Sequence, residues 1–413
     1  PPVRVFMWID AILAPFAGQL FRVGVRAAAL FGHQRAQALL RFRSATPIPN
    51  GPFDLWIHCA SHGEWETVQP VVLRFRTEHP SDRVLITFFS PSGLHARIPA
   101  SLNVSVGALP WDTPSAVRNF LDRTQPKRLV LVQYDLWPAL LHACRTRRIP
   151  WGVVNARWTP SLRWTRNLWQ SASWITVQTS EDAAHFQRLG LKAQAVGDTR
   201  FDNVVERASD ALPMDWLPDA FHTFNDAQGL VVLGSVWPED APLVLPLVAR
   251  FPEYKWIVVP HDISDSSLQI WASKIPAPHL RWSQLEAVDG EDSSRTLHPE
   301  NARALLVDRV GLLFPLYSLA SFAYVGGGRS GGQHNYWEPL AWGVPTAIAH
   351  EGQGTRPDAR EAADAGFLYP ARKTEDLCEQ WVHWQANPPQ GCTDWMQQKC
   401  GASEATLLAI LQS

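Results

Sequence analysis

Two series of short apolar runs, each separated by helix-like stretches, constrain the fold of this chain more than any other feature. The first series lies at residues 55–58, 83–87, 129–132 and 151–154, and the second at residues 230–235, 256–259, 304–307 and 322–325. Short apolar runs alternating with helix-like stretches, such as residues 64–77 and 137–147, predict βαβ units and a parallel sheet. The sequence therefore predicts an α/β protein with two Rossmann-like domains.

The length of the chain and its composition agree with two domains. Single hydrophobic cores rarely grow beyond about 250 to 300 residues, and this chain has 413. A proline-bearing connector at residues 211–218 separates the two series. We expect a helical segment at residues 1–45, one Rossmann-like domain at 46–205 and a second at 206–413, whose last helix can pack back on the first domain. A net charge of −2 excludes an overall basic surface for nucleic acid.

A glycine run in residues 323–339 (AYVGGGRSGGQHNYWEP) is the clearest candidate ligand site. An apolar strand ends there in glycines, and polar residues then open a helix. Glycines allow close backbone approach to a phosphate, and a helix N-terminus offers unpaired N–H groups. On a helix, Asn335 and Glu338 share one face, which puts the carboxylate near ribose hydroxyls. This spacing favours a nucleotide-sugar.

Two other interpretations of the glycine run stay open. The run can simply close an ordinary loop between a strand and a helix. It can also belong to a dehydrogenase-type dinucleotide site, although that motif is expected in the first βα turn of its unit, with an acid about 20 residues further on. The late position of this run disfavours the dehydrogenase interpretation.

The N-terminal residues 5–31 raise the question of membrane contact. They are mostly apolar, but Arg22 and Arg26 are among the polar residues that interrupt them. A spanning helix needs about 20 mostly apolar residues. We therefore expect an amphipathic segment on the membrane surface, followed by a basic flank at residues 35–43 that meets anionic headgroups. A transmembrane anchor and a buried helical hairpin are the alternatives.

The first half carries its own candidate chemistry in residues 59–64 (CASHGE), directly after an apolar run. Ligands of open α/β sheets bind beyond the carboxyl ends of strands. Glu64 at such a turn can take a proton from an acceptor hydroxyl as a general base. Alternatively it only complements the dipole of the helix that it opens. A metal site made by His58, Cys59 and His62 is disfavoured, because a strand and a turn do not bring all three side chains together.

Seven segments, in order along the chain, carry a family resemblance. The segments are residues 56–64 (WIHCASHGE), 88–93 (FFSPSG), 109–114 (LPWDTP), 134–138 (YDLWP), 197–202 (GDTRFD), 234–240 (GSVWPED) and 260–263 (PHDI). They resemble those of the Kdo transferases, which transfer 3-deoxy-D-manno-octulosonic acid (Kdo) from CMP-Kdo to a lipid A precursor. The chain is similar especially to the variant in Bacteroidetes-like members.

This resemblance implies a GT-B fold and an inverting transferase of lipopolysaccharide biosynthesis. It places the protein at the cytoplasmic face of the inner membrane, with CMP-Kdo as donor and a lipid A precursor as acceptor. It implies an acceptor-binding first domain and a CMP-Kdo-binding second domain. Neither a cofactor nor a metal is expected, because phosphate positioning by the protein makes CMP a good leaving group.

The resemblance also assigns roles to individual residues. Asp135 replaces a Glu of the family, His261 replaces an Arg, and His62 stands where a small or apolar residue is usual. The implied catalytic acids are Glu64 and Asp135; the donor side has Ser235, His261, Gly326, Gly327, Gly328, His334, Asn335 and Glu338; and the acceptor side has Ser61, Gly63, Ser92 and Gly93.

Two rival functions share the same fold and glycine run. One is a GT-B protein that binds a nucleotide-sugar or lipid without turnover, and Glu64 argues against it because a pure binder gains little from that carboxylate. The other is a different GT-B transferase or a nucleotide-sugar epimerase. The lipid-surface segment favours a transferase, since an epimerase has only soluble substrates.

Overall fold

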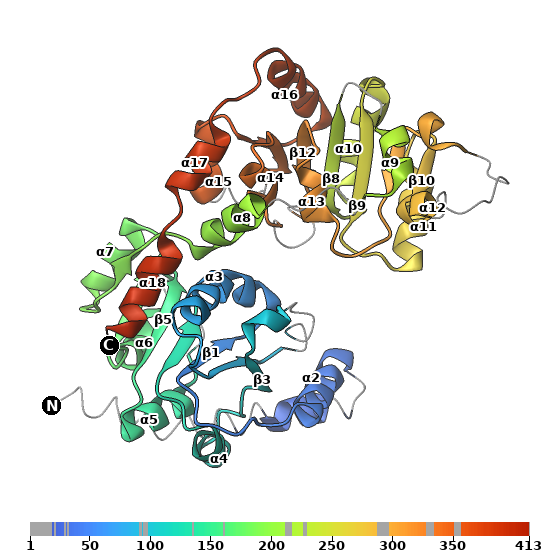
Figure 1. The fold of residues 1–413 in the computed structure, drawn as a ribbon. Coiled ribbons are helices and arrows are strands. Elements are labelled where there is room, and N and C mark those ends of the chain that lie inside the picture. The colour runs from blue at the N-terminus through green and yellow to red at the C-terminus, as the bar shows by residue number, and fades with distance from the viewer. Residues whose placement is uncertain are drawn as a thin grey trace. The chain divides into compact units, whose positions relative to one another are not determined.

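In the computed structural model the chain forms two compact units (Figure 1). Unit 1 consists of Pro1–Asn203 with Lys399–Ser413, and unit 2 of Val204–Gln398. The expected division at residue 205 lies close to this boundary, within one helix. The structure describes residues 19, 22–28, 30, 33–90, 93, 98–133, 136–159, 162–210, 217–225, 229–286, 297–327, 334–350 and 357–412.

Unit 1 contains a seven-stranded parallel sheet in the order β3-β2-β1-β4-β5-β6-β7. Its strands are β1 (Leu55–Cys59), β2 (Val84–Phe88), β3 (Ser105–Ala108), β4 (Leu129–Val132), β5 (Trp151–Ala156), β6 (Trp174–Val177) and β7 (Gln194–Ala195). Its helices are α2 (Gln34–Ala45), α3 (His62–Glu78), the 3₁₀ turn η2 (Ala100–Leu102), α4 (Pro114–Thr124), α5 (Pro138–Arg147), α6 (Leu162–Trp169), α7 (Ser180–Arg188) and α18 (Ala402–Leu411), and α8 (Thr199–Ser209) crosses the unit boundary.

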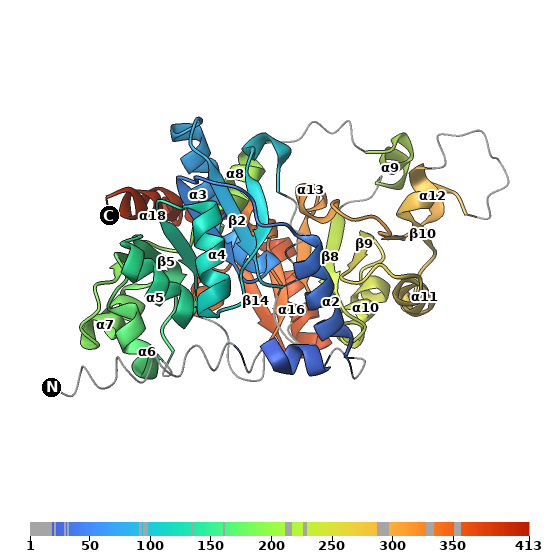
Figure 2. The same ribbon diagram turned by 90° about the horizontal axis from the view of Figure 1, so that it is seen from below.

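The central strands of unit 1 are short apolar segments that are buried on both faces. All residues of β1 and β4 are buried, as parallel sheets covered by helices require. One face packs on α4, α5, α6 and α7, and α5, α6 and α7 lie together beside β5 in Figure 2. The other face packs on α2, α3 and α18. The strand order reverses between β1 and β4, which marks the point where open α/β sheets bind ligands.

Unit 2 repeats this plan with a parallel sheet in the order β10-β11-β9-β8-β12-β13-β14. Its strands are β8 (Leu230–Val236), β9 (Lys255–Pro260), β10 (His279–Arg281), β11 (Ala304–Leu306), β12 (Phe322–Val325), β13 (Thr346–Ala349) and β14 (Leu368–Ala371). Its helices are α9 (Asp219–Phe224), α10 (Ala241–Arg250), α11 (Asp265–Lys274), α12 (Trp282–Glu286), the 3₁₀ turn η5 (Pro299–Asn301), α13 (Leu313–Tyr317), α14 (Trp337–Ala341), α15 (Pro357–Asp364), α16 (Thr374–Ala386) and α17 (Cys392–Gln398).

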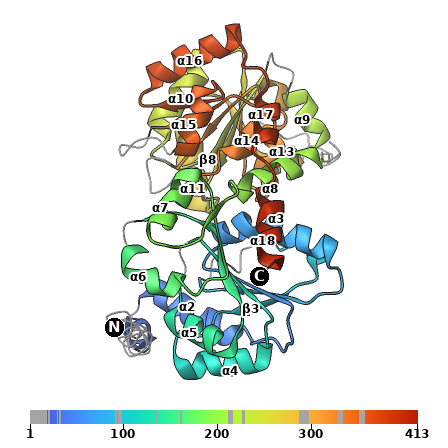
Figure 3. The same ribbon diagram turned by 90° about the vertical axis from the view of Figure 1, so that its left-hand side faces the viewer.

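An aromatic core holds one face of the unit 2 sheet. Trp256 and Trp381 stack with ring centroids 5.7 Å apart, and Phe322 lies 4.4 Å from Trp381. Helices α10 and α16 cover this face, and α13 and α14 lie on the other side of the sheet in Figure 3. The strand order reverses between β8 and β12, so Gly326 and Gly327, which follow β12, lie at the switch point.

Most of the expected membrane segment, residues 5–31, lies outside the described residues. Residues 22–28 are helical, and Val25 packs against the core that contains α2 and α3. Over the described ranges, no helix combines the length and the apolar character needed to cross a membrane.

Candidate active-site residues of the two units

Glu64 lies in the first turn of α3, directly beyond the carboxyl end of β1. Its Oε2 atom accepts a hydrogen bond of 2.5 Å from the backbone N–H of Ala60. Glu64 thus closes the turn that leads into α3, although Ser61 at the N-cap makes no side-chain hydrogen bond, so this is not a complete capping box. The carboxylate is half-buried and its orientation is fixed by the backbone. This arrangement suits a positioned base and also a helix cap.

Three of the resembling segments meet around Glu64. The N–H of Ser90 donates to the carbonyl of Ala60 at 2.9 Å, which ties the segment after β2 to that after β1. Trp137 lies 5.0 Å from Phe89 and 5.8 Å from His58 between ring centroids. The carboxyl ends of β1, β2 and β4 therefore converge, as expected for neighbouring strands of a parallel sheet.

Some of the expected acceptor-side residues lie at this edge of the sheet, beyond the carboxyl ends of the strands. Gly63 has open space around it, because a Cβ atom there would find its nearest neighbour, the Ser61 hydroxyl, at 4.0 Å. Gly93 is required sterically, since a Cβ atom would lie 2.2 Å from the Phe88 ring. Ser92 and Asp135 lie outside the described residues.

Asp112, in the segment 109–114, has a structural role that the sequence alone did not indicate. Its two carboxylate oxygens accept hydrogen bonds from the N–H groups of Ala139 and Leu140 at 3.1 and 2.9 Å. These are unpaired donors in the first turn of α5, so Asp112 caps that helix. Burial raises the pKa of the carboxyl although both hydrogen bonds lower it.

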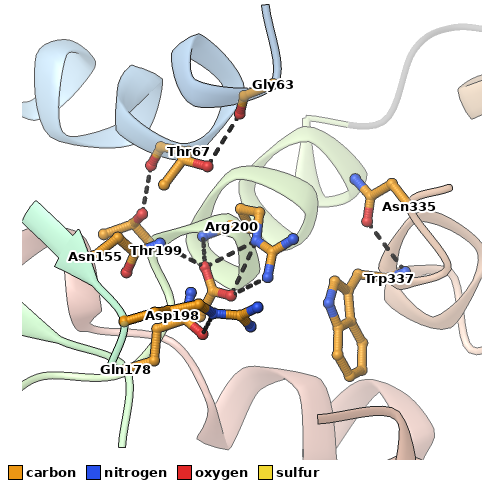
Figure 4. A network of polar contacts seen from close by, with 10 residues as sticks. Gly63, Thr67, Asn155, Gln178, Asp198, Thr199, Arg200, Asn335 and Trp337 are labelled. Carbon is orange, nitrogen blue, oxygen red and sulfur yellow. Dashed lines mark hydrogen bonds and ion pairs between the residues drawn. The ribbon is translucent and has the colours of Figure 1, made fainter. Parts of the chain in front are cut away.

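A buried polar network joins three elements of unit 1, and sequence reasoning did not find it (Figure 4). Asn155, at the end of β5 with a φ of 56°, donates to Asp198 at 3.0 Å. Arg200 Nε donates to the same carboxylate at 2.9 Å. Burial opposes ionisation of Asp198, yet the charge and hydrogen bonds of Arg200 lower its pKa. Thr199 then donates to the Thr67 carbonyl of α3, so the network anchors α8 to the helix that carries Glu64.

The metal set considered for the first half does not assemble. The His58 ring is fully buried and lies 3.1 Å from the hydroxyl of Thr87. His62 instead faces Glu66 at 3.5 Å on the surface of α3. In the described ranges, no three His, Cys, Asp or Glu side chains come together as metal ligands.

In unit 2, Ser235 is a strained residue at the switch point. Its φ is 50°, a left-handed conformation that costs a residue other than glycine about 1 kcal/mol or more. The pairing of β8 with β9 shifts register between Gly234 and Val236, so Ser235 stands in a bulge. Bulges of this kind redirect side chains next to ligand sites.

The glycine turn after β12 is held by a buried carboxylate, Asp240. Its side chain is fully buried and accepts hydrogen bonds from Trp237 N–H at 2.9 Å, Tyr324 O–H at 2.9 Å and Gly327 N–H at 3.3 Å. Gly326 N–H donates to the Gly234 carbonyl at 2.9 Å. These two glycine amides are therefore used within the protein. Gly328 lies outside the described residues.

Gly326 is required because β8 approaches it closely. A Cβ atom at this position would lie 2.6 Å from the Ser235 carbonyl oxygen and 2.7 Å from the Val236 Cα atom. Both are backbone atoms, which do not move aside easily. Sequence reasoning explained these glycines by phosphate approach, and the structure adds that strand packing requires Gly326.

Three rings stack beside this turn. His261 lies 4.3 Å from His334 and 4.6 Å from Trp237 between ring centroids. Trp237 Nε1 donates to His334 Nε2 at 2.9 Å, so that nitrogen carries no proton. Burial, and then the charge of His261, lower the pKa of His334 to about 4. Burial also lowers the pKa of His261, so both imidazoles favour the neutral form.

The expected shared helix face of Asn335 and Glu338 is wrong. Helix α14 begins at Trp337 and has only five residues, so Asn335 precedes it. Its side chain accepts a hydrogen bond from Trp337 N–H at 3.3 Å, the local contact that makes Asn a helix-start residue. Glu338 is mostly buried and lies 3.4 Å from Arg207 Nη1. A five-residue helix also carries little dipole for a phosphate.

The fold and the position of these residues define a class of protein. The structure is similar to UDP-GlcNAc 2-epimerase from Neisseria meningitidis bound to UDP-GlcNAc, with a TM-score of 0.58, 14% identity and coverage of 87% of this chain and 100% of the other. It is also similar to the glycotransferase of kitacinnamycin, with a TM-score of 0.52, 12% identity and coverage of 86% and 98%. At such identities the likeness concerns the fold alone, and the chain has the α/β GT-B fold.

Sequence comparison finds similarity to one family of transferases within this class. Residues 27–203 match the family described as 3-deoxy-D-manno-octulosonic-acid transferase (kdotransferase). The chain is 27% identical to such a transferase of Aquifex aeolicus, over 75% of this chain and 79% of the relative. It is 26% identical to that of Bordetella pertussis, over 99% of this chain and 96% of the relative. These matches support a Kdo transferase.

Proposed function

We propose that this enzyme transfers Kdo from CMP-Kdo to a lipid A precursor with inversion at the anomeric carbon. The observation that carries the proposal is the family match, which includes a relative aligned with 99% of the chain. Further support comes from the positions of the motif residues, which gather beyond the carboxyl ends of the strands in each sheet. The reaction belongs to lipopolysaccharide biosynthesis, at the cytoplasmic face of the inner membrane.

Glu64 acts as the general base in this proposal. The acceptor hydroxyl oxygen attacks the anomeric carbon of Kdo, the bond from that carbon to the CMP phosphate oxygen breaks, and CMP leaves with the bonding electrons. The hydroxyl proton passes to the Glu64 carboxylate. The backbone N–H of Ala60 holds one carboxylate oxygen at 2.5 Å and so fixes the direction in which the group accepts the proton.

Unit 2 binds the donor in this proposal. The Ser235 hydroxyl and the rings of His261 and His334 supply hydrogen bonds to the CMP phosphate. Glu338 accepts hydrogen bonds from the ribose hydroxyls. Because the amides of Gly326 and Gly327 already bond within the protein, side chains rather than these amides contact the phosphate. Asp135, which lies outside the described residues, is the second catalytic acid in this proposal.

The test is transfer by Glu64→Gln, measured by the mass of the product formed from CMP-Kdo and a lipid A precursor. Loss of general-base catalysis costs about a hundredfold to ten-thousandfold in rate. Glu66→Gln is the matched control, because Glu66 lies on the same helix and its side chain is 38% exposed. We expect the control to keep the parent rate.

Two results would contradict the proposal in different ways. A Glu64→Gln variant that transfers Kdo at the parent rate would reduce Glu64 to a helix cap, whose loss costs at most about 1 kcal/mol of stability. A parent protein that forms no Kdo-containing product but interconverts a nucleotide-sugar would support the epimerase alternative. Binding of CMP-Kdo without turnover by the parent would support the non-catalytic alternative.

A further inference from the structure

Arg157 of unit 1 carries a positive charge that no carboxylate balances within the described ranges. It directly follows β5, and its Nε atom donates to Oε1 of Gln178 at 2.8 Å. Gln178 directly follows the next strand of the sheet, β6. The two outer nitrogens of the guanidinium make no hydrogen bond or ion pair with the described residues, whereas Arg200 is paired with Asp198. Arg157 therefore offers the two nitrogens that bind an anion side by side.

The backbone on both sides of Arg157 is anchored. Asn155 has a φ of 56° and stands in a bulge, where the pairing of β5 with β6 shifts register, and bulges redirect side chains next to functional sites. Trp158 N–H donates to the Asp182 carboxylate at 2.9 Å, and the Trp158 ring stacks on that of His185 at 4.9 Å between centroids. Because its backbone is anchored and its Nε atom is bonded, the guanidinium loses little freedom when it binds an anion.

The polar network of Figure 4, in which Gln178 takes part, is also incomplete. Gln178 Nε2 and Asn155 Oδ1 are buried and have no hydrogen-bond partner among the described residues. Unpaired buried polar atoms are rare in native proteins, where a functional role, an ion or a bound water accounts for them. Together with the unpaired guanidinium, these atoms point to a ligand site at the ends of β5 and β6.

The position of Arg157 matches one particular group of the reacting sugar. Only β4 separates β1 from β5, so the ends of β1 and β5 lie about 10 Å apart at the usual strand spacing. In the proposed reaction the acceptor hydroxyl lies at Glu64, and the anomeric carbon of Kdo comes within about 3 Å of that hydroxyl. Kdo is an ulosonic acid, whose carboxylate is bonded directly to the anomeric carbon. The long side chain of Arg157 can reach that carboxylate from the end of β5.

The described donor-side residues of unit 2 leave this carboxylate without a free cation. They are a serine, glycines, an asparagine, a carboxylate and the two stacked imidazoles, which favour the neutral form. Arg207 is already paired with Glu338. A carboxylate that is withdrawn from water needs a charged or hydrogen-bonding partner, and the unpaired guanidinium supplies one.

We propose that Arg157 binds the carboxylate of the Kdo unit during transfer and that Gln178 positions the guanidinium. A guanidinium and a carboxylate form two parallel charge-assisted hydrogen bonds, so the contact orients the anomeric carbon as well as holding the sugar. Such orientation contributes to the rate, because attack requires aligned atoms. The assignment rests on the proposed function for the identity of the donor. It makes Arg157 a determinant of specificity for acidic over neutral sugars.

The test compares two donors, CMP-Kdo and its carboxamide analogue, in which an uncharged amide replaces the carboxylate. Transfer to the lipid A precursor by the full chain is followed by product mass, and kcat/KM is obtained for each donor. The parent should prefer CMP-Kdo. Arg157→Gln should lower kcat/KM for CMP-Kdo about tenfold or more, as expected for a lost charge-assisted hydrogen bond. It should leave kcat/KM for the amide almost unchanged, so that the preference falls.

Arg166→Gln is the matched control. Arg166 is an exposed arginine of unit 1, and its Nε atom also donates to the protein, at 2.6 Å to the Leu189 carbonyl. Its replacement should leave the donor preference at the parent value. Arg157→Lys keeps a positive charge and should keep part of the preference, so the test stands if circular dichroism shows that Arg157→Gln does not fold.

Gln178→Ala tests the positioning role separately. The guanidinium keeps its charge in this variant but loses the acceptor that orients it. The preference for CMP-Kdo over the amide should therefore fall, by less than in Arg157→Gln. A purely structural role of Gln178 would lower kcat/KM for both donors by the same factor.

Four outcomes would overturn the assignment. The parent may use both donors equally well, or Arg157→Gln may lose the same factor with both. Arg157→Gln may also transfer nothing from the amide, although without the guanidinium no charge favours the carboxylate. Finally, it may raise the KM for the acceptor and leave that for CMP-Kdo unchanged, which would assign the guanidinium to the acceptor. A parent that transfers no Kdo refutes the proposed function itself, whereas a parent that transfers Kdo with any of these results refutes only the role of Arg157.

Discussion

Replacement of Asp240 by alanine should destabilise unit 2 more than any single loss of one of its partners. The buried carboxylate accepts three hydrogen bonds, from Trp237 N–H, Gly327 N–H and Tyr324 O–H. Hydrogen bonds to a charged group contribute about 1.5–3 kcal/mol each. Their sum overestimates the effect, because removing the carboxylate also removes the cost of keeping a charge out of water. We expect a loss of about 3–5 kcal/mol.

Urea unfolding of the full chain, followed by tryptophan fluorescence and circular dichroism, measures this loss. Tyr324→Phe is the control, because it deletes one of the three donors and leaves the carboxylate in place. It should cost about 1.5–3 kcal/mol. CMP-Kdo binding by calorimetry should also weaken in Asp240→Ala, since the carboxylate orients the glycine turn. Unfolding free energies of the two variants within about 0.5 kcal/mol, the usual limit of additivity, would refute the role of Asp240 as a shared acceptor.

Three further predictions concern unit 2. Gly326→Ala should destabilise the protein by about 1–3 kcal/mol through overpacking, whereas Gly63→Ala in unit 1 should be tolerated. Equal urea unfolding midpoints of these two variants would contradict this prediction. Glu338→Ala should weaken CMP-Kdo binding tenfold or more, and Arg207→Ala should not. Equal affinities of these two variants for CMP-Kdo in calorimetry would show that Glu338 serves only in the ion pair with Arg207. The pKa of His334 is lowered to about 4, so the neutral ring stabilises the fold fully above pH 6.5, and this stabilisation is lost as the pH falls toward 4. His334→Gln should therefore reduce the fall of the urea unfolding midpoint between pH 6.5 and pH 4. An equally steep fall in the parent and the variant would exclude His334 as the group that titrates.

The central strands of both sheets could be predicted because their burial leaves a plain apolar signal. The run at residues 129–132 coincides with β4, and that at 322–325 coincides with β12. Peripheral strands lack this signal. Both residues of β7 are exposed, and Pro370 lies within β14, which is tolerated because β14 is an edge strand without a further neighbour.

The candidate site could be placed from the sequence, but its internal bonding could not. Spacing indicated that Glu64 follows a strand and that glycines follow another. Two of the site's hydrogen bonds join residues far apart in the sequence: Tyr324 and Asp240 are 84 positions apart, and Asn155 and Asp198 are 43 positions apart. No local sequence pattern predicts such contacts. The helix start at Trp337 was misplaced because Asn335 carries a strong capping signal just before it.

The return of the chain to unit 1 at α18 imposes an order on synthesis. Leu407 and Ile410 of α18 are buried against α3, but the ribosome makes them only after all of residues 204–398. Since domains fold as units while the chain emerges, unit 2 can complete its core before unit 1 does. Until α18 is made, the apolar surface of α3 that it covers remains exposed. A nascent chain released before residue 402 would expose that surface, which makes it a recognition site for chaperones and proteases.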